Sequence, residues 1–384
     1  MRSMDIAIAG AGIGGLAAAA LLLRAGHRVT VYEQAERFAR VGSGIQMAPN
    51  AMKVLRWLGV EQRLVATGFQ AEFAISRTWD SGAETSRLEL GDAVAREFGA
   101  PYLFLHRADL HAAIADIVPP EVVRFSHRLS SVREDRDGVT LGFEGGARER
   151  ADLLVGADGV HSRVREILLG PERPRYTGRV AYRTVLPAER VRGLSLEPVR
   201  TKWWGPDRHM VVYFVSRNRD QLYFVTSVPE PAEWATPESW SSRGELDELR
   251  AAYAGFHPEV QALLDACPEV WKWALFERDP LARWSSERVV LLGDACHPMT
   301  PYMAQGAASA LEDAAVLARC LDEAQPGSVH EAFVRYERIR KPRASTIQAG
   351  SSANNWLRDR ADPGWVYGYD ACTADLDAVV PAPA

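Results

Sequence analysis

Residues 4–33 read MDIAIAGAGIGGLAAAALLLRAGHRVTVYE and contain the pattern that decides the fold. The apolar residues 4–9 predict a buried parallel strand, and the alanine- and leucine-rich residues 16–24 predict a helix. Gly26 is expected to end that helix. Residues 28–33, which include the β-branched Val29, Thr30 and Val31, predict a second strand. The stretch therefore predicts a strand–helix–strand unit that opens a Rossmann-like α/β domain.

Four glycines stand in the turn after the first strand. Gly10, Gly12 and Gly15 form a GxGxxG pattern, and Gly14 lies inside it. Gly10 allows a tight turn, Gly12 lets the backbone approach a pyrophosphate, and Gly15 lets the helix pack close to the strand. Glu33 follows Gly15 by 18 residues (33 − 15), which places its carboxylate at the ribose hydroxyls. The stretch predicts a dinucleotide site, but it does not choose between NAD and FAD.

Two further apolar strands end in a glycine-flanked aspartate. Residues 151–155 lead into Gly156-Ala157-Asp158-Gly159, and residues 288–292 lead into Gly293-Asp294. Pro301, Gln305 and Gly306 follow the second motif, and residues 307–321 predict a helix. Each motif alone is compatible with an ordinary turn after a strand. Both motifs in this order are much harder to explain as ordinary turns.

Together these motifs, between residues 6 and 369, resemble the class A flavoprotein aromatic hydroxylases, the group that includes 4-hydroxybenzoate and salicylate hydroxylases. The resemblance implies bound FAD. It also implies that Asp294 contacts the ribitol, with Gln305 and Gly306 beside the isoalloxazine, where the helix N-terminus stabilises negative charge on the reduced flavin. The other residues that the resemblance assigns to the cofactor are Arg107, Asp158, Gly293, Pro301 and Gly44, the last within a mobile flavin loop at residues 41–45. Ala304 departs from the pattern, because many members have glycine there.

The chain has no second GxGxxG pattern. This fits the family, in which NADH or NADPH binds transiently, reduces the flavin and leaves. Dioxygen is the other co-substrate. The resemblance implies hydroxylation of a small, electron-rich aromatic ring through a flavin C4a-hydroperoxide.

The middle of the chain, residues 176–277, is rich in tryptophan and tyrosine and predicts a mostly antiparallel sheet. Alternation along residues 209–214 places His209, Val211 and Tyr213 on one face. That face can line a pocket, although the same pattern fits a core sheet with a partly exposed histidine.

Several segments are similar to the subgroup of this family that hydroxylates 6-hydroxynicotinate, among them residues 202–213, 303–306 and 362–370. The resemblance implies a hydroxylated aromatic or pyridine carboxylate near His209 and Tyr213. We expect His209 to act as the base and Tyr213 to orient the ring, with carbon dioxide released if a carboxylate occupies the attacked carbon. Gln46 and Tyr302 stand where the pattern has histidines beside the flavin, so the substrate is expected to be related but different.

These observations divide the chain into a discontinuous FAD-binding domain (1–175 and 278–355), an inserted substrate domain (176–277) and a C-terminal segment (356–384) with a disordered end. The net charge of −5 excludes a basic nucleic-acid-binding surface, and no apolar run reaches membrane-spanning length. With no signal peptide and four cysteines in no CxxC pair, we expect a cytoplasmic monomer or homodimer with reduced thiols and no metal.

Other functions on this scaffold remain open. A flavin oxidase or a urate-type hydroxylase would share the FAD motifs. A halogenase would need a GWxWxIP-type motif, of which Trp271-Lys272-Trp273 has only the WxW spacing. A non-catalytic FAD-binding protein is the remaining class.

Overall fold

The computed structural model describes residues 3–39, 43–194, 196–230, 242–324, 328–354, 356 and 362–377. Val41 and Gly42 of the expected flavin loop, and the expected disordered end from residue 378, lie outside these ranges.

A five-stranded parallel sheet forms the dinucleotide-binding half. Its strands, in spatial order, are β18 (Val289–Leu291), β11 (Leu153–Gly156), β1 (Asp5–Ala9), β2 (Arg28–Tyr32) and β7 (Val123–Arg124). Helix α1 (Ile13–Arg24) connects β1 to β2, as the sequence predicts. Because β1, β11 and β18 are parallel neighbours, their carboxyl ends meet at one edge of the sheet. The three glycine motifs that follow these strands are therefore brought together.

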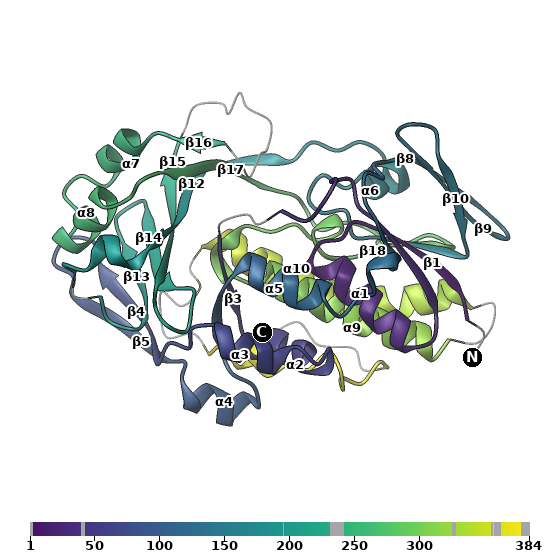
Figure 1. Ribbon diagram of the computed structural model, residues 1–384, viewed down its shortest axis with the longest axis horizontal. Coiled ribbons are helices and arrows are strands. Elements are labelled where there is room, and N and C mark those ends of the chain that lie inside the picture. The colour runs from purple at the N-terminus through teal and green to yellow at the C-terminus, as the bar shows by residue number, and fades with distance from the viewer. Residues whose placement is uncertain are drawn as a thin grey trace.

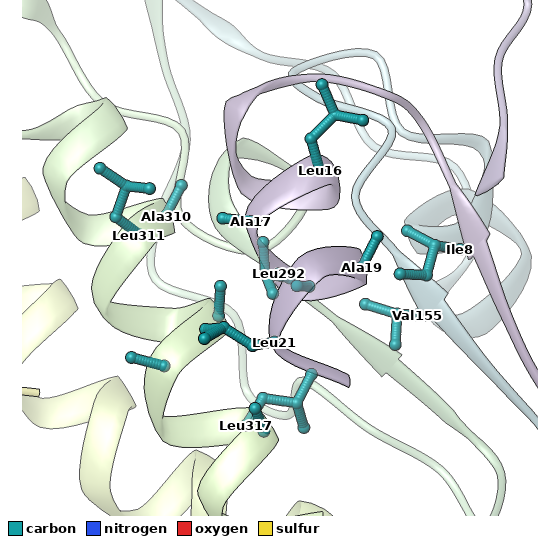
Figure 2. Close-up of a cluster of buried hydrophobic side chains, with 14 of the residues drawn as sticks. Ile8, Leu16, Ala17, Ala19, Leu21, Val155, Leu292, Ala310, Leu311 and Leu317 are labelled. Carbon is teal, nitrogen blue, oxygen red and sulfur yellow. The ribbon is translucent and has the colours of Figure 1, made fainter. Parts of the chain in front are cut away.

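The core of this half lies between α1 and the long helix α9 (Gly306–Asp322). Figure 2 shows Leu292, Ala310 and Leu317 beside α1, and Ile8 and Val155 of the sheet on another side of that helix. Ala17, Ala18 and Ala19 are almost completely buried, so their small side chains allow the neighbouring elements to approach closely.

An eight-stranded sheet forms the other half. Its strands, in spatial order, are β16 (Arg243–Gly244), β17 (Val270–Glu277), β12 (Arg175–Pro187), β15 (Gln221–Pro229), β14 (His209–Phe214), β13 (Arg200–Trp204), β4 (Phe73–Thr78) and β5 (Glu84–Glu89). Neighbouring strands are antiparallel except β13 and β4. The fold class is thus confirmed, but the sheet extends beyond residues 176–277, because β4 and β5 join it from the N-terminal part of the chain.

Smaller elements complete the fold. Strands β8 (Leu129–Asp135), β9 (Gly138–Phe143) and β10 (Arg148–Ala151) form an antiparallel sheet, and β3 (Gly44–Met47) pairs with β6 (Leu103–His106). The other helices are α2 (Pro49–Trp57), α3 (Glu61–Thr67), α4 (Asp92–Phe98), α5 (Arg107–Ala115), α6 (Arg163–Leu169), α7 (Leu246–Ala252), α8 (Pro258–Asp265), α10 (Val329–Ala353) and α11 (Gly364–Tyr367). Short 3-10 turns are η1 (Pro120–Val122), η2 (Ala188–Val191), η3 (Gly293–Ala295) and η4 (Pro301–Met303).

Figure 1 shows the two large sheets toward opposite ends of the long axis, with β3 and α10 between them. Among the described helices, none has the length and apolar character needed to cross a membrane. Val366 and Tyr367 of the C-terminal segment pack into the apolar cluster of the eight-stranded sheet.

Candidate active site

The loop after β1 has the geometry expected of a pyrophosphate-binding turn. Gly10 has a φ of +100°, and a Cβ added there would lie 2.4 Å from the Ala157 oxygen. A Cβ added at Gly15 would lie 2.1 Å from the Gly10 oxygen, so the glycine is needed for α1 to approach β1. A Cβ added at Gly12 has no atom within 4 Å. Open space at the first turn of α1, which has no side-chain cap, is what a bound phosphate requires.

Both backbone polar groups of Ala11, its nitrogen and its oxygen, have side-chain partners. Glu33 Oε2 accepts a hydrogen bond from the Ala11 nitrogen at 2.9 Å, and His111 Nε2 lies 2.8 Å from the Ala11 oxygen. Glu33 thus stands at the end of β2 beside the glycine loop, and its contact with the ribose hydroxyls stays a prediction. His111 was missed by the sequence interpretation, because nothing in its local pattern on α5 indicates contact with this loop.

Gly14 and Asp158 make protein contacts that the sequence interpretation did not foresee. A Cβ added at Gly14 would lie 2.6 Å from Leu292 Cδ2, so this glycine serves the close packing of α1. The Asp158 carboxylate accepts hydrogen bonds from Ser162 Oγ and from the backbone nitrogens of Arg163 and Val164. The N-cap residue of α6 is Ser162, and Asp158 adds to this cap by accepting from the first two backbone N–H groups, in addition to the cofactor contact predicted for it.

Arg107, at the start of α5, and Asp294, in η3, lie close enough that the charge of each acts on the pKa of the other. Both side chains are exposed. Desolvation nevertheless raises the pKa of Asp294 and lowers that of Arg107, so protein surrounds both groups. A Cβ added at Gly306 would lie 3.8 Å from Asp294 Oδ1, which places the start of α9 beside Asp294. An acid, a cation and an uncapped helix N-terminus close to one another fit the polar groups and charge of a flavin.

The N-terminus of α9 has no side-chain cap. Its first turn also carries no acidic residue. Gln305 precedes it and is buried, and its Oε1 accepts a hydrogen bond from Asn50 Nδ2 at 2.9 Å. Gly293, with a φ of +64°, donates its backbone N–H to Asp313 Oδ2 at 3.0 Å. Side chains of α2 and α9 thus fix the loops that approach the flavin position.

A buried charge network lies beneath this end of α9. Glu312 pairs with Arg343 and Arg340, which lower its pKa although burial raises it. Asn50 Nδ2 also donates to Glu312 Oε1 at 2.6 Å. Arg343 further donates to the backbone oxygens of Trp365 at 2.8 Å and Val366 at 3.0 Å. The network therefore connects the N-terminal end of α9 to the C-terminal segment.

One group of potential metal ligands occurs in the described part of the chain, formed by Cys296, His297 and Asp313 within 4.8 Å. The Asp313 carboxylate already contacts His297 Nε2 at 2.5 Å and Arg340 Nε at 2.7 Å. These contacts make Asp313 part of the internal charge network.

A pocket lies between the eight-stranded sheet and the turn that precedes α9. Its lining mixes aromatic, apolar and basic side chains: Gln46, Ala74, Leu90, Tyr102, Arg200, Lys202, His209, Val211, Val225, Thr226, Pro301, Tyr302, Met303, Ala304, Trp356 and Tyr367. Three of the four predicted catalytic residues are in this set, and η4 with Ala304 connects it directly to Gln305. The pocket is therefore placed to hold a ring next to the flavin position.

His209 is buried and stands beside two aromatic rings. Its imidazole centroid lies 5.1 Å from that of Trp204 and 5.5 Å from that of Tyr302. Burial holds the pKa of His209 well below its usual 6.5, and nearby cations add to the shift: Lys202, Arg179 and Arg200. The imidazole is therefore neutral at neutral pH and can accept a proton.

Tyr302 and Gln46 both have defined partners. The Tyr302 hydroxyl lies 2.8 Å from Ser227 Oγ, which also accepts a hydrogen bond from Arg179 Nε at 2.7 Å. Gln46 Oε1 accepts a hydrogen bond from the Tyr102 hydroxyl at 2.8 Å. The amide orientation of Gln46 thus leaves its nitrogen as a donor.

Tyr213 lies behind the lining. Its ring centroid is 4.8 Å from that of Phe104 and 5.1 Å from that of Tyr223. A Cβ added at Gly44 would lie 2.9 Å from the Tyr213 hydroxyl, so Gly44 is required for β3 to pack on this sheet. These contacts place Tyr213 behind Gln46, on the same sheet face as His209.

Sequence interpretation missed three lining residues at the other end of the pocket, Arg200, Tyr102 and Tyr367. Arg200 lies on β13, Tyr102 precedes β6, and Tyr367 lies on α11, so the three come from parts of the chain that are far apart in the sequence. Alternation along β13 could have placed Arg200 on the face of Lys202, but no local signal brings the two tyrosines there.

The chain belongs to the FAD binding domain family, whose pattern matches residues 3–351. It is therefore a flavoprotein that uses FAD, as the motifs predict. Within that family it is an FAD-dependent aromatic monooxygenase, because relatives that are 50% and 47% identical over 97% and 98% of this chain are named monooxygenases.

Two relatives and one solved structure show which proteins of this kind the chain is similar to. The chain is 50% identical over 371 residues to the 6-hydroxynicotinate 3-monooxygenase of Bordetella bronchiseptica, covering 97% of this chain and 96% of that protein. It is 41% identical over 387 residues to the 3-amino-4-hydroxybenzoate 2-monooxygenase PtmB3 of Streptomyces platensis, and the match covers 95% of this chain and 96% of that protein. Klebsiella pneumoniae HpxO, solved with FAD and uric acid, aligns with a TM-score of 0.81 at 29% identity, covering 91% of this chain and 87% of that chain.

Proposed function

We propose that the protein uses NADH or NADPH, dioxygen and FAD to hydroxylate a small ring that carries a hydroxyl and a carboxylate. The substrate to test first is 6-hydroxynicotinate. The observation that carries this proposal is the neutral, buried His209 in an aromatic pocket that adjoins the start of α9. The named activities of the relatives support the same class of substrate.

The cofactor contacts are part of the proposal. Gly12 and the α1 N-terminus would hold the pyrophosphate, and Glu33 the adenosine ribose. Asp294 and Arg107 would lie along the ribityl and flavin portion. The remaining predicted contacts are Gly10, Gly15, Gly44, Asp158, Gly293, Pro301, Gln305 and Gly306. Bound FAD supplies the oxygen-activating redox chemistry.

His209 makes the ring reactive in this proposal. A neutral imidazole accepts the proton of the ring hydroxyl, which raises the electron density at the neighbouring carbon. Tyr302, held by Ser227, donates or accepts a hydrogen bond at the same end of the pocket. The aromatic lining excludes water, which would otherwise promote the loss of activated oxygen as hydrogen peroxide without ring hydroxylation.

We also propose that the enzyme works in the cytoplasm as a monomer or homodimer without nucleic acid. All four cysteines are free thiols in the structure, which supports a reducing compartment.

The proposal is tested by measuring NADH or NADPH oxidation together with product mass on the FAD-loaded protein. The panel contains 6-hydroxynicotinate, 3-amino-4-hydroxybenzoate, 3-hydroxybenzoate and urate. We expect a ring acid to give coupled turnover, with one product hydroxyl per reduced nicotinamide consumed. The mass also shows whether carbon dioxide is lost. Product formation without any nicotinamide would identify an oxidase, and coupled turnover of urate alone would replace the ring-acid assignment.

A further inference from the structure

Arg200 is a buried cation that the proposed chemistry does not use. It lies on β13, is 7% exposed and lines the pocket that contains His209. Within the described residues it has no ion pair with an acid, and the pocket lining contains no aspartate or glutamate. Burial lowers the pKa of Arg200, yet a guanidinium keeps its charge in proteins. A charge in this position is costly unless an anion accompanies it.

The groups around Arg200 are hydrogen-bond donors. Tyr102, Tyr367 and Tyr213 are the residues whose charges act on its pKa. Burial raises the pKa of Tyr102 to about 12, so its phenol stays protonated and donates to Gln46 Oε1. One N–H of the Gln46 amide donates to the Tyr213 hydroxyl, which opposes the rise in the pKa of that phenol, and the second N–H remains as a donor at the same end of the pocket. An ionised carboxylate has only acceptor oxygens, so it can accept hydrogen bonds from several of these donors at once.

The strand register places this end of the pocket away from His209. Trp204 of β13 is opposite His209, and Lys202 is opposite Val211. Arg200 therefore lies four residues along β13 from the level of His209, which is about 13 Å of strand rise. Arginine is long enough to reach back toward the centre of the pocket. One ring can thus have its acidic substituent at Arg200 and its hydroxyl at His209.

Lys202 is the other basic residue of the lining, and it is already engaged. Its Nζ lies 3.7 Å from the centroid of the Trp204 ring. The cation–π contact satisfies part of its charge. Arg200 is therefore the better-placed partner for an incoming anion.

We propose that Arg200 binds the substrate carboxylate, with Gln46 Nε2 as a second donor, and thereby selects ring acids and directs their hydroxyl toward His209. The inference rests on the proposed function, because it assumes that the pocket holds the substrate ring. It makes Arg200 the specificity-determining residue for acids over uncharged analogues.

The test compares acids with their carboxamides on the FAD-loaded enzyme. The probes are 6-hydroxynicotinate with 6-hydroxynicotinamide, and 4-hydroxybenzoate with 4-hydroxybenzamide. Kd is measured from the change in flavin absorbance and by calorimetry, without turnover. We expect wild type to prefer each acid by roughly 10- to 100-fold, the effect of a charge-assisted hydrogen bond.

Arg200→Met is expected to lose this preference and Arg200→Lys to keep part of it. Arg87→Met is the matched control, because Arg87 is an arginine of the same sheet, on edge strand β5, where it pairs with Glu84. That control is expected to retain the wild-type preference. Flavin content and circular dichroism show whether each variant is folded.

Two outcomes would overturn the inference. One is that the wild-type protein binds an acid and its carboxamide with nearly equal Kd values, a result that needs no variant. The other is a preference for the acid that survives Arg200→Met but disappears in Lys202→Met. Failure of the proposed function is distinguishable, because it appears as absent hydroxylation in wild type while the binding ratios still report on Arg200.

Discussion

Two alanine substitutions in the glycine loop separate folding from cofactor binding. At Gly15 an added Cβ would lie 2.1 Å from the Gly10 oxygen, a backbone atom that cannot rotate away. At Gly12 the same Cβ would meet nothing within 4 Å, and the backbone φ of −74° suits alanine. Gly15→Ala should therefore damage the fold, whereas Gly12→Ala should only fill the space that the pyrophosphate needs.

The magnitudes follow from these distances. Forcing α1 away from β1 in Gly15→Ala should lower the free energy of unfolding by about 1–3 kcal/mol, the usual cost of overpacking. Gly12→Ala should raise the same quantity by about 0.4–1 kcal/mol, because alanine has less freedom in the unfolded chain. Gly14→Ala should be intermediate, because its Cβ would meet the end of the Leu292 side chain, which can shift.

Urea unfolding of the FAD-free protein measures the stability change, and quenching of flavin fluorescence measures the Kd for FAD. We expect Gly12→Ala to lose FAD affinity with its stability intact. Wild-type FAD affinity in Gly12→Ala would refute the assignment of this loop to the pyrophosphate. Equal destabilisation by Gly12→Ala and Gly15→Ala would refute the packing argument.

His209→Gln should keep FAD but lose product formation by about 10²- to 10⁴-fold, since the amide cannot accept the proton. Because the pKa of wild-type His209 is held well below 6.5, its neutral form persists as the pH falls through 6.5, and kcat/KM should show no acidic limb near that pH. Ala304→Gly should raise the free energy of unfolding by up to about 1 kcal/mol, because Ala304 has a φ of +55°; thermal unfolding measures this change. Asp158→Ala should lower it by about 0.5–2 kcal/mol through loss of its part of the α6 cap, measured by urea unfolding.

Each of these predictions has a result that contradicts it. Coupled turnover in His209→Gln would remove the imidazole from the proton transfer, and an acidic limb near pH 6.5 that disappears in this variant would contradict the lowered pKa. A destabilised Ala304→Gly would show that the left-handed backbone is not strained. An unchanged urea midpoint in Asp158→Ala would show that α6 does not depend on the Asp158 carboxylate.

The dinucleotide-binding half could be predicted because its signals are local. Gly10, Gly15 and Glu33 each report a backbone constraint or a spacing within one strand–helix–strand unit. The same reasoning located the ends of β11 and β18, and parallel pairing then brings all three motifs to one edge.

The substrate half was predicted less completely because its contacts are non-local. Alternation predicted β14 and β15, but it carries no information about which sheet β4 and β5 join. Tyr102, Arg200 and Tyr367 approach one another only through tertiary packing. The Asp158 cap was different, because an aspartate shortly before Ser162 and a helix is a capping signal that could have been read.

The contact of Arg343 with Trp365 and Val366 has a practical meaning for protein engineering. The C-terminal segment supplies two acceptors to a buried guanidinium and also the Tyr367 wall of the pocket. Trimming the chain before Gly364 would remove both. An expression tag is better placed at the N-terminus, and a shortened chain should be judged first by its substrate affinity.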